Sequence, residues 1–310
     1  MIHNLCNLCI FVNLCNMCIR LDITILSIVY FITDVNNEME EDSVATVIVV
    51  ANQKGGIGKT TTACTLAATL AHYGREVLCI DADMQCNTTD TYNAKTEGVA
   101  TLYDLLSDPQ GMSPLDAVQT TSYGNIIAGD RLLGNADVDL QKDMVNGLYR
   151  MQMFMQPLRD AYDYIIIDTN PTVNHLLVNC LVAADKVIIP MTADRYGLIG
   201  LKQVIDTIKA VQSRQNTSLE ILGILLVKYK ANTSLERSIK ESLITSGNQI
   251  GVHVFNTTVR DSVKVREAQA AKQPIITYDP RNNATKDYIA FVKELIGQDT
   301  IPTGRYSNEF

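Results

Sequence analysis

The chain has 310 residues, of which 46% are hydrophobic and 19% charged, and its formal net charge is −8. These values are ordinary for a globular protein, and the length is sufficient for one large α/β domain with a full core. The negative net charge argues against a surface that coats nucleic acid as a whole, although it is compatible with a local basic face. The four histidines lie far apart in the sequence, so they do not predict a metal site.

The first 38 residues differ from the rest of the chain. A repeated Asn-Leu-Cys-Asn-x-Cys-Ile segment places cysteines at positions 6, 9, 15 and 18, with the spacing C-x₂-C-x₅-C-x₂-C. Two such pairs can supply four thiolates to zinc. The central gap is short for a zinc ribbon and the pairs lack the usual glycines, so we do not favour this interpretation. We expect residues 1–38 to be an extension that is disordered or absent from the native protein, which would then begin at Met39.

A glycine-rich loop between a predicted strand and a predicted helix is the most informative feature. Residues 44–51 form a β-branched apolar run typical of a buried parallel strand, and residues 62–73 are rich in Ala and Leu and precede Gly74, as at a helix end. Backbone N–H groups and a helix N-terminus bind phosphate in such a loop, where Lys59 would supply charge to the β- and γ-phosphates and Thr60 a hydroxyl to Mg²⁺. The predicted nucleotide-binding residues are Lys54, Gly55, Gly56, Ile57, Gly58, Lys59, Thr60 and Thr61.

This loop departs from the standard G-x-x-x-x-G-K-[ST] pattern at its first glycine. Gln53 stands there, and a second lysine, Lys54, follows it. The resulting K-G-G-x-G-K-T-T sequence resembles the deviant Walker A motif of the ParA/MinD family. The resemblance implies that Lys54 reaches the nucleotide of a second subunit in a homodimer that sandwiches ATP. A glycine-rich turn with incidental lysines is the alternative, which the flanking strand and helix disfavour.

Two more predicted strands end in carboxylates. Residues 76–80 lead into Asp81-Ala82-Asp83, and residues 164–167 lead into Asp168. Carboxylates at the carboxyl ends of parallel strands beside a phosphate-binding loop hold Mg²⁺ or the attacking water, and Asp168 has the position of a Walker B residue. An acidic turn is the alternative for residues 81–83. The resemblance to the family's D-x-D-P-Q-G-N segment implies that Asp83 positions the water and that Asp81 supports it. We therefore expect Lys54, Lys59 and Asp83 to be catalytic and Thr60, Asp81 and Asp168 to hold the metal.

Three residues depart from the pattern of that family. Met84 and Cys86 stand where the family usually has Pro and Gly, and Asn170 replaces the first proline of the D-x-P-P-S turn. We expect these changes to loosen the two loops and to affect the hydrolysis rate. They leave open a different class of protein, a nucleotide-responsive DNA-binding regulator with negligible turnover.

Alternating strand and helix patterns follow along the chain. We expect a helix over 101–107, a strand over 125–128 and a terminal helix over 286–297. Between them we expect a strand over 186–190 followed by a helix over 197–211, and a strand over 221–227 followed by a helix over 234–246 that ends at Gly247. A helical stripe of apolar residues, expected in the core, comprises Met144, Leu148, Met151, Met155 and Leu158. Repeated strand–helix units predict an α/β fold with a doubly wound, mostly parallel sheet and helices on both faces. One ATPase domain would span residues 39–297, followed by a polar tail over 298–310.

The last third of the chain also resembles chromosomal ParA (Soj) proteins, so that the resemblance spans about residues 45–296. Lys264 aligns with an arginine that the family uses to contact DNA phosphates, and Arg260 and Arg266 are basic residues close to it. The resemblance implies contacts to non-specific DNA that are independent of sequence and weakened by salt. Because each subunit offers few cations, such a site would need the ATP-bound dimer.

The same resemblance implies a function. It indicates a slow Mg²⁺-dependent ATPase that is cytoplasmic and nucleoid-associated, is stimulated by a ParB-like partner and drives plasmid or chromosome partition. The nearest alternative is a MinD-like membrane-cycling ATPase, which requires an amphipathic C-terminal helix with a basic face. Residues 286–297 instead predict a packed helix before a polar tail. We therefore expect no stable membrane association.

Overall fold

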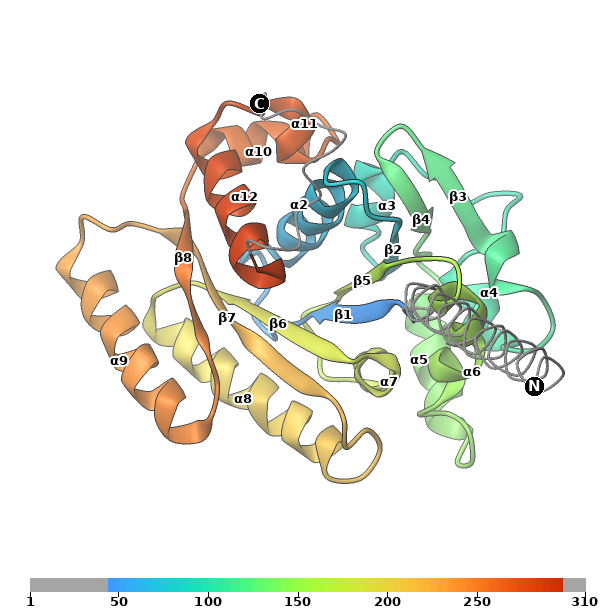
Figure 1. Cartoon of the computed structure of the whole chain (residues 1–310). Helices are drawn as coiled ribbons and strands as arrows, with labels where there is room; N and C mark the ends of the chain where they lie inside the picture. The colour runs from blue at the N-terminus through green and yellow to red at the C-terminus, as the bar shows by residue number, and fades with distance from the viewer. Residues whose placement is uncertain (1–43, 298–310) are drawn as a thin grey trace, which may run out of the picture. The chain divides into compact units, whose positions relative to one another are not determined.

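The computed structural model describes residues 44–297, which contain an eight-stranded sheet in the order β3-β4-β2-β5-β1-β6-β7-β8 (Figure 1). All neighbouring strands pair in parallel except β3 and β4. The predicted doubly wound, mostly parallel α/β fold is therefore confirmed. The strands are β1 (Thr46–Val50), β2 (Val77–Ala82), β3 (Val118–Thr121), β4 (Gly124–Ile127), β5 (Tyr164–Thr169), β6 (Lys186–Met191), β7 (Glu220–Tyr229) and β8 (Val254–Arg260).

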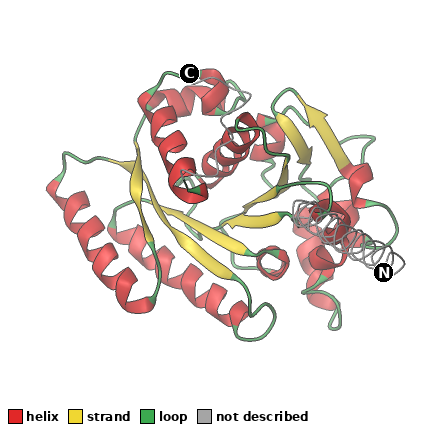
Figure 2. Cartoon of the chain, viewed as in Figure 1, coloured by secondary structure: helices red, strands yellow, loops and turns green. Residues whose placement is uncertain are grey.

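Helices cover both faces of this sheet (Figure 2). Figure 1 shows α2 and α12 on one face and α7 and α8 on the other. The described helices are α2 (Lys59–His72), α3 (Asn87–Thr91), α4 (Leu102–Ser107), the 3₁₀ helix η1 (Pro114–Ala117), α5 (Leu133–Lys142), α6 (Arg150–Arg159), α7 (His175–Ala183), α8 (Arg195–Gln212), α9 (Ser234–Ile250), α10 (Val263–Ala270), α11 (Ile275–Tyr278) and α12 (Asn283–Ile296). None of them has both the length and the apolar character needed to cross a bilayer.

The central strand β1 shows why these sequences form a two-faced core. Its side chains alternate between the faces, so that Val47 and Val49 pack in one apolar cluster while Ile48 and Val50 pack in the other. All four are at most 1% exposed. A strand buried on both sides needs an apolar residue at every position, and this explains the continuous β-branched run.

The sheet order brings the predicted site residues to one edge. β1 lies between β5 and β6, and β5 also pairs with β2. Asp81 at the end of β2 is in direct register with Asp168 at the end of β5, and Val50 at the end of β1 is also paired with Asp168. Ligands of open α/β sheets bind at such a place, outside the carboxyl ends of strands near a reversal of strand order.

The predicted apolar stripe is wrong at its first residue. Met144 is 95% exposed, because Asp143 accepts hydrogen bonds from the backbone N–H groups of Val145 and Asn146 and the chain turns between α5 and α6. The helical spacing thus begins in the turn between α5 and α6 and continues into α6. The later members of the stripe are buried in α6 or half-buried just before it: Leu148, Met151, Met155 and Leu158.

The expected end of α9 at Gly247 is also wrong. The helix continues to Ile250 and ends at Gly251, whose φ of 71° is the left-handed conformation that glycine favours. A Cβ on Gly247 would lie 2.5 Å from the carbonyl oxygen of Val252. Gly247 is therefore required for a close backbone approach inside the helix.

Two predicted segments, residues 1–38 with their two cysteine pairs and residues 298–310, lie outside the described residues. The boundaries of the domain at Met39 and at residue 297 stay predictions for the same reason.

Candidate functional site

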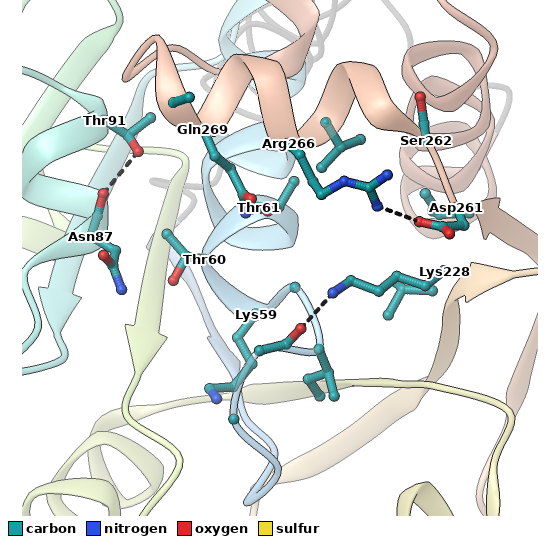
Figure 3. A pocket seen from close by; sticks show the side chains of 18 of the residues that line it. Lys59, Thr60, Thr61, Asn87, Thr91, Lys228, Asp261, Ser262, Arg266 and Gln269 are labelled. Atoms are coloured by element: carbon teal, nitrogen blue, oxygen red, sulfur yellow. Dashed lines mark hydrogen bonds and ion pairs between the residues drawn. The ribbon is translucent and has the colours of Figure 1, made fainter.

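A cleft of about 590 Å³ opens beside the glycine-rich loop. Most of its lining comes from four parts of the chain: the loop with the start of α2, the segment from the end of β2 through α3, the ends of β7 and β8, and α10 (Figure 3). Gly56 and Gly58 have φ values of 70° and 105°, which disfavour any other residue. A Cβ at either position would meet no atom within 4 Å, so the loop faces open space. The cleft has room for a ligand directly against the loop.

Lys59 places a buried charge at the base of this cleft. Lys59 is the first residue of α2 and is only 6% exposed. Its Nζ donates back across the loop to the carbonyl of Lys54 at 3.4 Å. Burial lowers the pKa of Lys59, while the carboxylates of Asp168 and Asp83 oppose this shift. The helix N-terminus and this lysine together attract an anion.

Thr60 and Asp168 meet at the same edge. The Thr60 hydroxyl donates to Asp168 Oδ2 at 2.7 Å, and the Thr88 hydroxyl donates to the same oxygen at 2.8 Å. Asp168 Oδ1 is buried and has no hydrogen-bond partner among the described residues. Burial raises the pKa of Asp168 to about 6, although the bonds from Thr60 and Thr88 oppose the rise. A cation beside this oxygen would remove the cost of an unpaired buried acceptor.

These groups fit a magnesium ion. Mg²⁺ prefers oxygen ligands and usually takes only one or two protein groups, leaving its other positions to water and to phosphate oxygens. The Thr60 hydroxyl and the unpaired oxygen of Asp168 are such groups. No cluster of three His, Cys, Asp or Glu side chains that could hold a metal alone is found within residues 44–297.

Asp81 has a setting that differs from the one expected for a metal ligand. Its Oδ1 accepts from the backbone N–H of Asp83 at 3.1 Å, and its Oδ2 accepts from the N–H and the hydroxyl of Thr89, both at 2.7 Å. Burial, followed by repulsion from Asp168, raises the pKa of Asp81 to about 7. Both oxygens are thus used within the protein, and they fix the segment that carries Asp83.

Asp83 lines the cleft. It is 6% exposed, and its Oδ1 accepts from the N–H of Gln85 at 2.9 Å. The turn continues into Cys86, which precedes α3 and has a φ of 54°. Cys86 therefore adopts the left-handed conformation that glycine favours.

Replacement Cys86→Gly is expected to raise the free energy of unfolding by up to about 1 kcal/mol, because the left-handed conformation costs a residue with a Cβ roughly that amount. Denaturant unfolding measures the change. Asn93 also has a φ of 54°, and Asn tolerates this region well, so Asn93→Gly is the matched control with a smaller gain. A loss of stability in Cys86→Gly would contradict the prediction.

Asn170 is buried directly after β5. Its Oδ1 accepts from the N–H of Thr172 at 3.2 Å, and its Nδ2 has no hydrogen-bond partner among the described residues. Its side chain therefore folds back on the following turn. The greater mobility that we expected for this segment stays a prediction.

Lys54 contacts residues of its own chain. Its Nζ donates to both carboxylate oxygens of Asp194, at 3.0 and 2.7 Å, and to the Thr192 hydroxyl at 3.0 Å. Asp194 also accepts from the N–H of Gly197 and so begins α8. The Lys54 side chain keeps 30% of its surface exposed. The lysine is thus held beside the loop by an ion pair that solvent can reach.

The three cations expected at DNA do not form one free basic patch. The guanidinium of Arg260 makes two hydrogen bonds to Asp287, at 2.6 and 2.8 Å, and Lys264 pairs with Glu267 at 2.7 Å. Arg266 bonds Asp261 at 3.2 Å. Arg260 and Arg266 line the cleft, which differs from the expected DNA-facing position, whereas Lys264 is not part of the lining.

Several residues of the site were not predicted from the sequence. Thr88 and Thr89 hold the two buried carboxylates, and Gln269 of α10 donates to the Thr61 hydroxyl at 2.7 Å. The threonines directly follow the segment from Asp81 to Asn87, so their position in the sequence was a usable signal. Gln269 lies 208 residues from Thr61 in the sequence, and no local pattern relates the two.

Comparisons with known proteins show similarity over most of the chain. The model of an AAA domain family, AAA_31, matches residues 45–221. The sporulation initiation inhibitor protein Soj of Bacillus subtilis is 34% identical over 252 residues, which cover 80% of this chain and 97% of Soj. The chromosome partitioning protein ParA of Myxococcus xanthus is 33% identical over 259 residues, covering 83% and 90%.

A solved structure shares the fold. Cobyrinic acid a,c-diamide synthase from Mycobacterium smegmatis, with bound ATP analog and magnesium, superposes with a TM-score of 0.70 at 25% identity and covers 84% of this chain and 98% of its own. The level of identity to Soj and ParA over almost their whole length shows common descent. The chain therefore belongs to the Soj/ParA family of chromosome-partitioning P-loop ATPases.

Proposed function

We propose that this chain is a slow, Mg²⁺-dependent ATPase that acts as a switch in plasmid or chromosome partition. The observation that carries the proposal is the convergence of Lys59, Thr60 and Asp83 on one cleft beside a phosphate-binding loop, with the buried Asp168 hydrogen-bonded to Thr60. The bound ATP analog and magnesium of the structural relative support the same ligands here.

Each residue would contribute through position and charge. Lys59 and the loop N–H groups would bind the β- and γ-phosphates, and Thr60 and Asp168 would hold Mg²⁺, which neutralises phosphate charge when bound. Asp83 would orient and polarise the attacking water. Asp81 would act as a positioning residue, because its bonds to Thr89 and to the N–H of Asp83 fix the segment. No covalent intermediate is required.

The proposal includes an ATP-dependent homodimer. Lys54 would leave Asp194 and contact the phosphates of the partner subunit's nucleotide. The ion pair of Lys54 with Asp194 would be lost at little cost, because an exposed ion pair contributes only about 0–1 kcal/mol to stability. The bond from Lys54 to a phosphate oxygen would be stronger, because it is charge-assisted.

DNA binding is proposed as a property of this dimer. Lys264 lies outside the cleft lining, so the Lys264 residues of two subunits would contact DNA phosphates without regard to sequence. Lys264 would first leave Glu267, and Arg260 and Arg266 would contribute only after leaving Asp287 and Asp261. A ParB-like partner would stimulate hydrolysis and release the dimer from DNA, and the protein would be cytoplasmic and nucleoid-associated.

Light scattering with and without Mg-ATP tests the dimer. We expect the native chain to double its mass with ATP, Lys59→Ala to bind no ATP, and Lys54→Ala to bind ATP but stay monomeric. Lys186→Ala is the matched control, because this half-exposed lysine pairs with Glu220 at the opposite end of β6. It should dimerise like the native chain. The same samples passed over non-specific DNA should be retained only as dimers and released by salt.

Two outcomes would count against the scheme. A Lys54→Ala variant that dimerises with ATP would remove Lys54 from the interface. A native chain that binds ATP yet stays monomeric at all concentrations would refute the sandwich.

A further inference from the structure

A third lysine, Lys228, reaches the phosphate-binding loop from the far side of the cleft. Its Nζ donates to the carbonyl oxygen of Gly56 at 2.6 Å, although the two residues are 172 positions apart. Figure 3 shows its side chain extending from β7 toward the loop before α2, and it lines the cleft. The sequence pattern gave this lysine no role.

The backbone at Lys228 is shaped to direct this side chain. Lys228 has a φ of 52°, in the region that residues with a Cβ rarely adopt, and the pairing of β7 with β8 loses its regular register between Leu226 and Tyr229. Irregularities of this kind redirect side chains and are enriched beside active sites. A local conformation that is unfavourable in itself therefore aims the ammonium group at the loop.

The charge of Lys228 is available to a ligand. Three other cations of the cleft lining are paired with carboxylates: Arg260 with Asp287, Arg266 with Asp261 and Lys272 with Asp90. Lys228 instead bonds a neutral carbonyl group, and this bond does not neutralise its charge. Lys59 and Lys228 both lie in the lining of the cleft, one at the start of α2 and the other on β7.

We propose that Lys228 is a further nucleotide-binding residue, whose ammonium group binds the polyphosphate chain and holds the loop in its binding conformation. This inference rests on the proposed nucleotide site. It identifies the ligand class by charge. Lys228 should increase the affinity for nucleoside di- and triphosphates, but it should add little to the affinity for a monophosphate, which leaves the loop mostly empty.

The test measures binding of ADP, ATP and AMP by fluorescence titration in the presence of Mg²⁺. Lys228→Gln keeps an N–H donor and removes the charge. Lys228→Gly removes the side chain and also relieves the positive φ, so its unfolding midpoint without nucleotide should equal or exceed that of the native chain. Both variants should bind ADP and ATP about tenfold more weakly, the order expected for one charge-assisted bond, with AMP changed less than about twofold.

Lys240→Gln is the matched control. Lys240 also donates from its Nζ to a backbone carbonyl, that of Asn256 at 2.8 Å, but it lies on α9 and is not part of the cleft lining. It should bind all three nucleotides like the native chain.

Three results would overturn the inference. If Lys228→Gly binds ADP with native affinity, Lys228 has no role in nucleotide binding. If Lys228→Gln binds ADP with native affinity, the positive charge of Lys228 does not contribute to binding. If the variants lose equal affinity for AMP and ADP, Lys228 only supports the loop and does not bind the polyphosphate chain. Native ADP affinity in Lys59→Ala would instead refute the proposed nucleotide site itself, so the two failures are distinguishable.

Discussion

Asp83→Ala is expected to reduce the rate of ATP hydrolysis about 100-fold or more, the usual contribution of a group that orients or activates the attacking water. The residue lies in the cleft at 6% exposure, on a segment fixed by Asp81, so its carboxylate is aimed before the nucleotide arrives. Nucleotide binding should persist, because Lys59 and the loop are unchanged. The variant should therefore accumulate as an ATP-bound dimer, measured by phosphate release together with light scattering.

Asp90→Ala is the control for this experiment. Asp90 lines the same cleft, but its side chain is 61% exposed and pairs with Lys272 at 3.3 Å. Its removal should leave hydrolysis within about threefold, since exposed ion pairs contribute little. Unchanged turnover in Asp83→Ala, or equal losses in the two variants, would remove Asp83 from the mechanism.

Asp168→Asn is expected to abolish Mg²⁺-dependent hydrolysis, with a loss of about 100-fold or more. The native carboxylate accepts from Thr60 and Thr88 through one oxygen and leaves the other unpaired in a buried site. An amide keeps the shape but removes the negative charge that a divalent cation requires. Titration of the rate with MgCl₂ measures the effect, and native rates at raised Mg²⁺ would contradict the assignment.

The pH dependence of stability tests whether this loss is a folding defect. Burial raises the pKa of Asp168 to about 6, above the ordinary carboxyl value near 4, so the folded state binds more protons than the unfolded state between these values. In metal-free buffer the native chain should therefore lose stability as the pH rises from about 4 to above 6. The free energy of unfolding of Asp168→Asn should fall less over the same pH range, and at neutral pH the variant should be at least as stable as the native chain.

Particular residues show how far the sequence could be interpreted. Local signals are carried by the apolar runs that end in Asp81 and Asp168 and by the loop from Lys54 to Thr61. The structure brings Lys59, Thr60, Asp83 and Asp168 to one edge of the sheet. By contrast, β3 was not predicted. It is a short antiparallel edge strand whose half-buried polar residues lack the continuous apolar run of the central strands.

What the sequence by itself determined is the set of elements and the chemical groups at their ends, because burial on both faces of a parallel sheet requires an apolar residue at every position of a strand. What only the tertiary structure decided is which partner each polar group found. The order of strands in space and local backbone turns bring together three such pairs: Lys54 with Asp194, Lys228 with Gly56 and Asp81 with Thr89. A hydrogen bond depends on the distance and angle between two atoms, and residues 140 or 172 positions apart leave no periodic trace of their meeting in the chain.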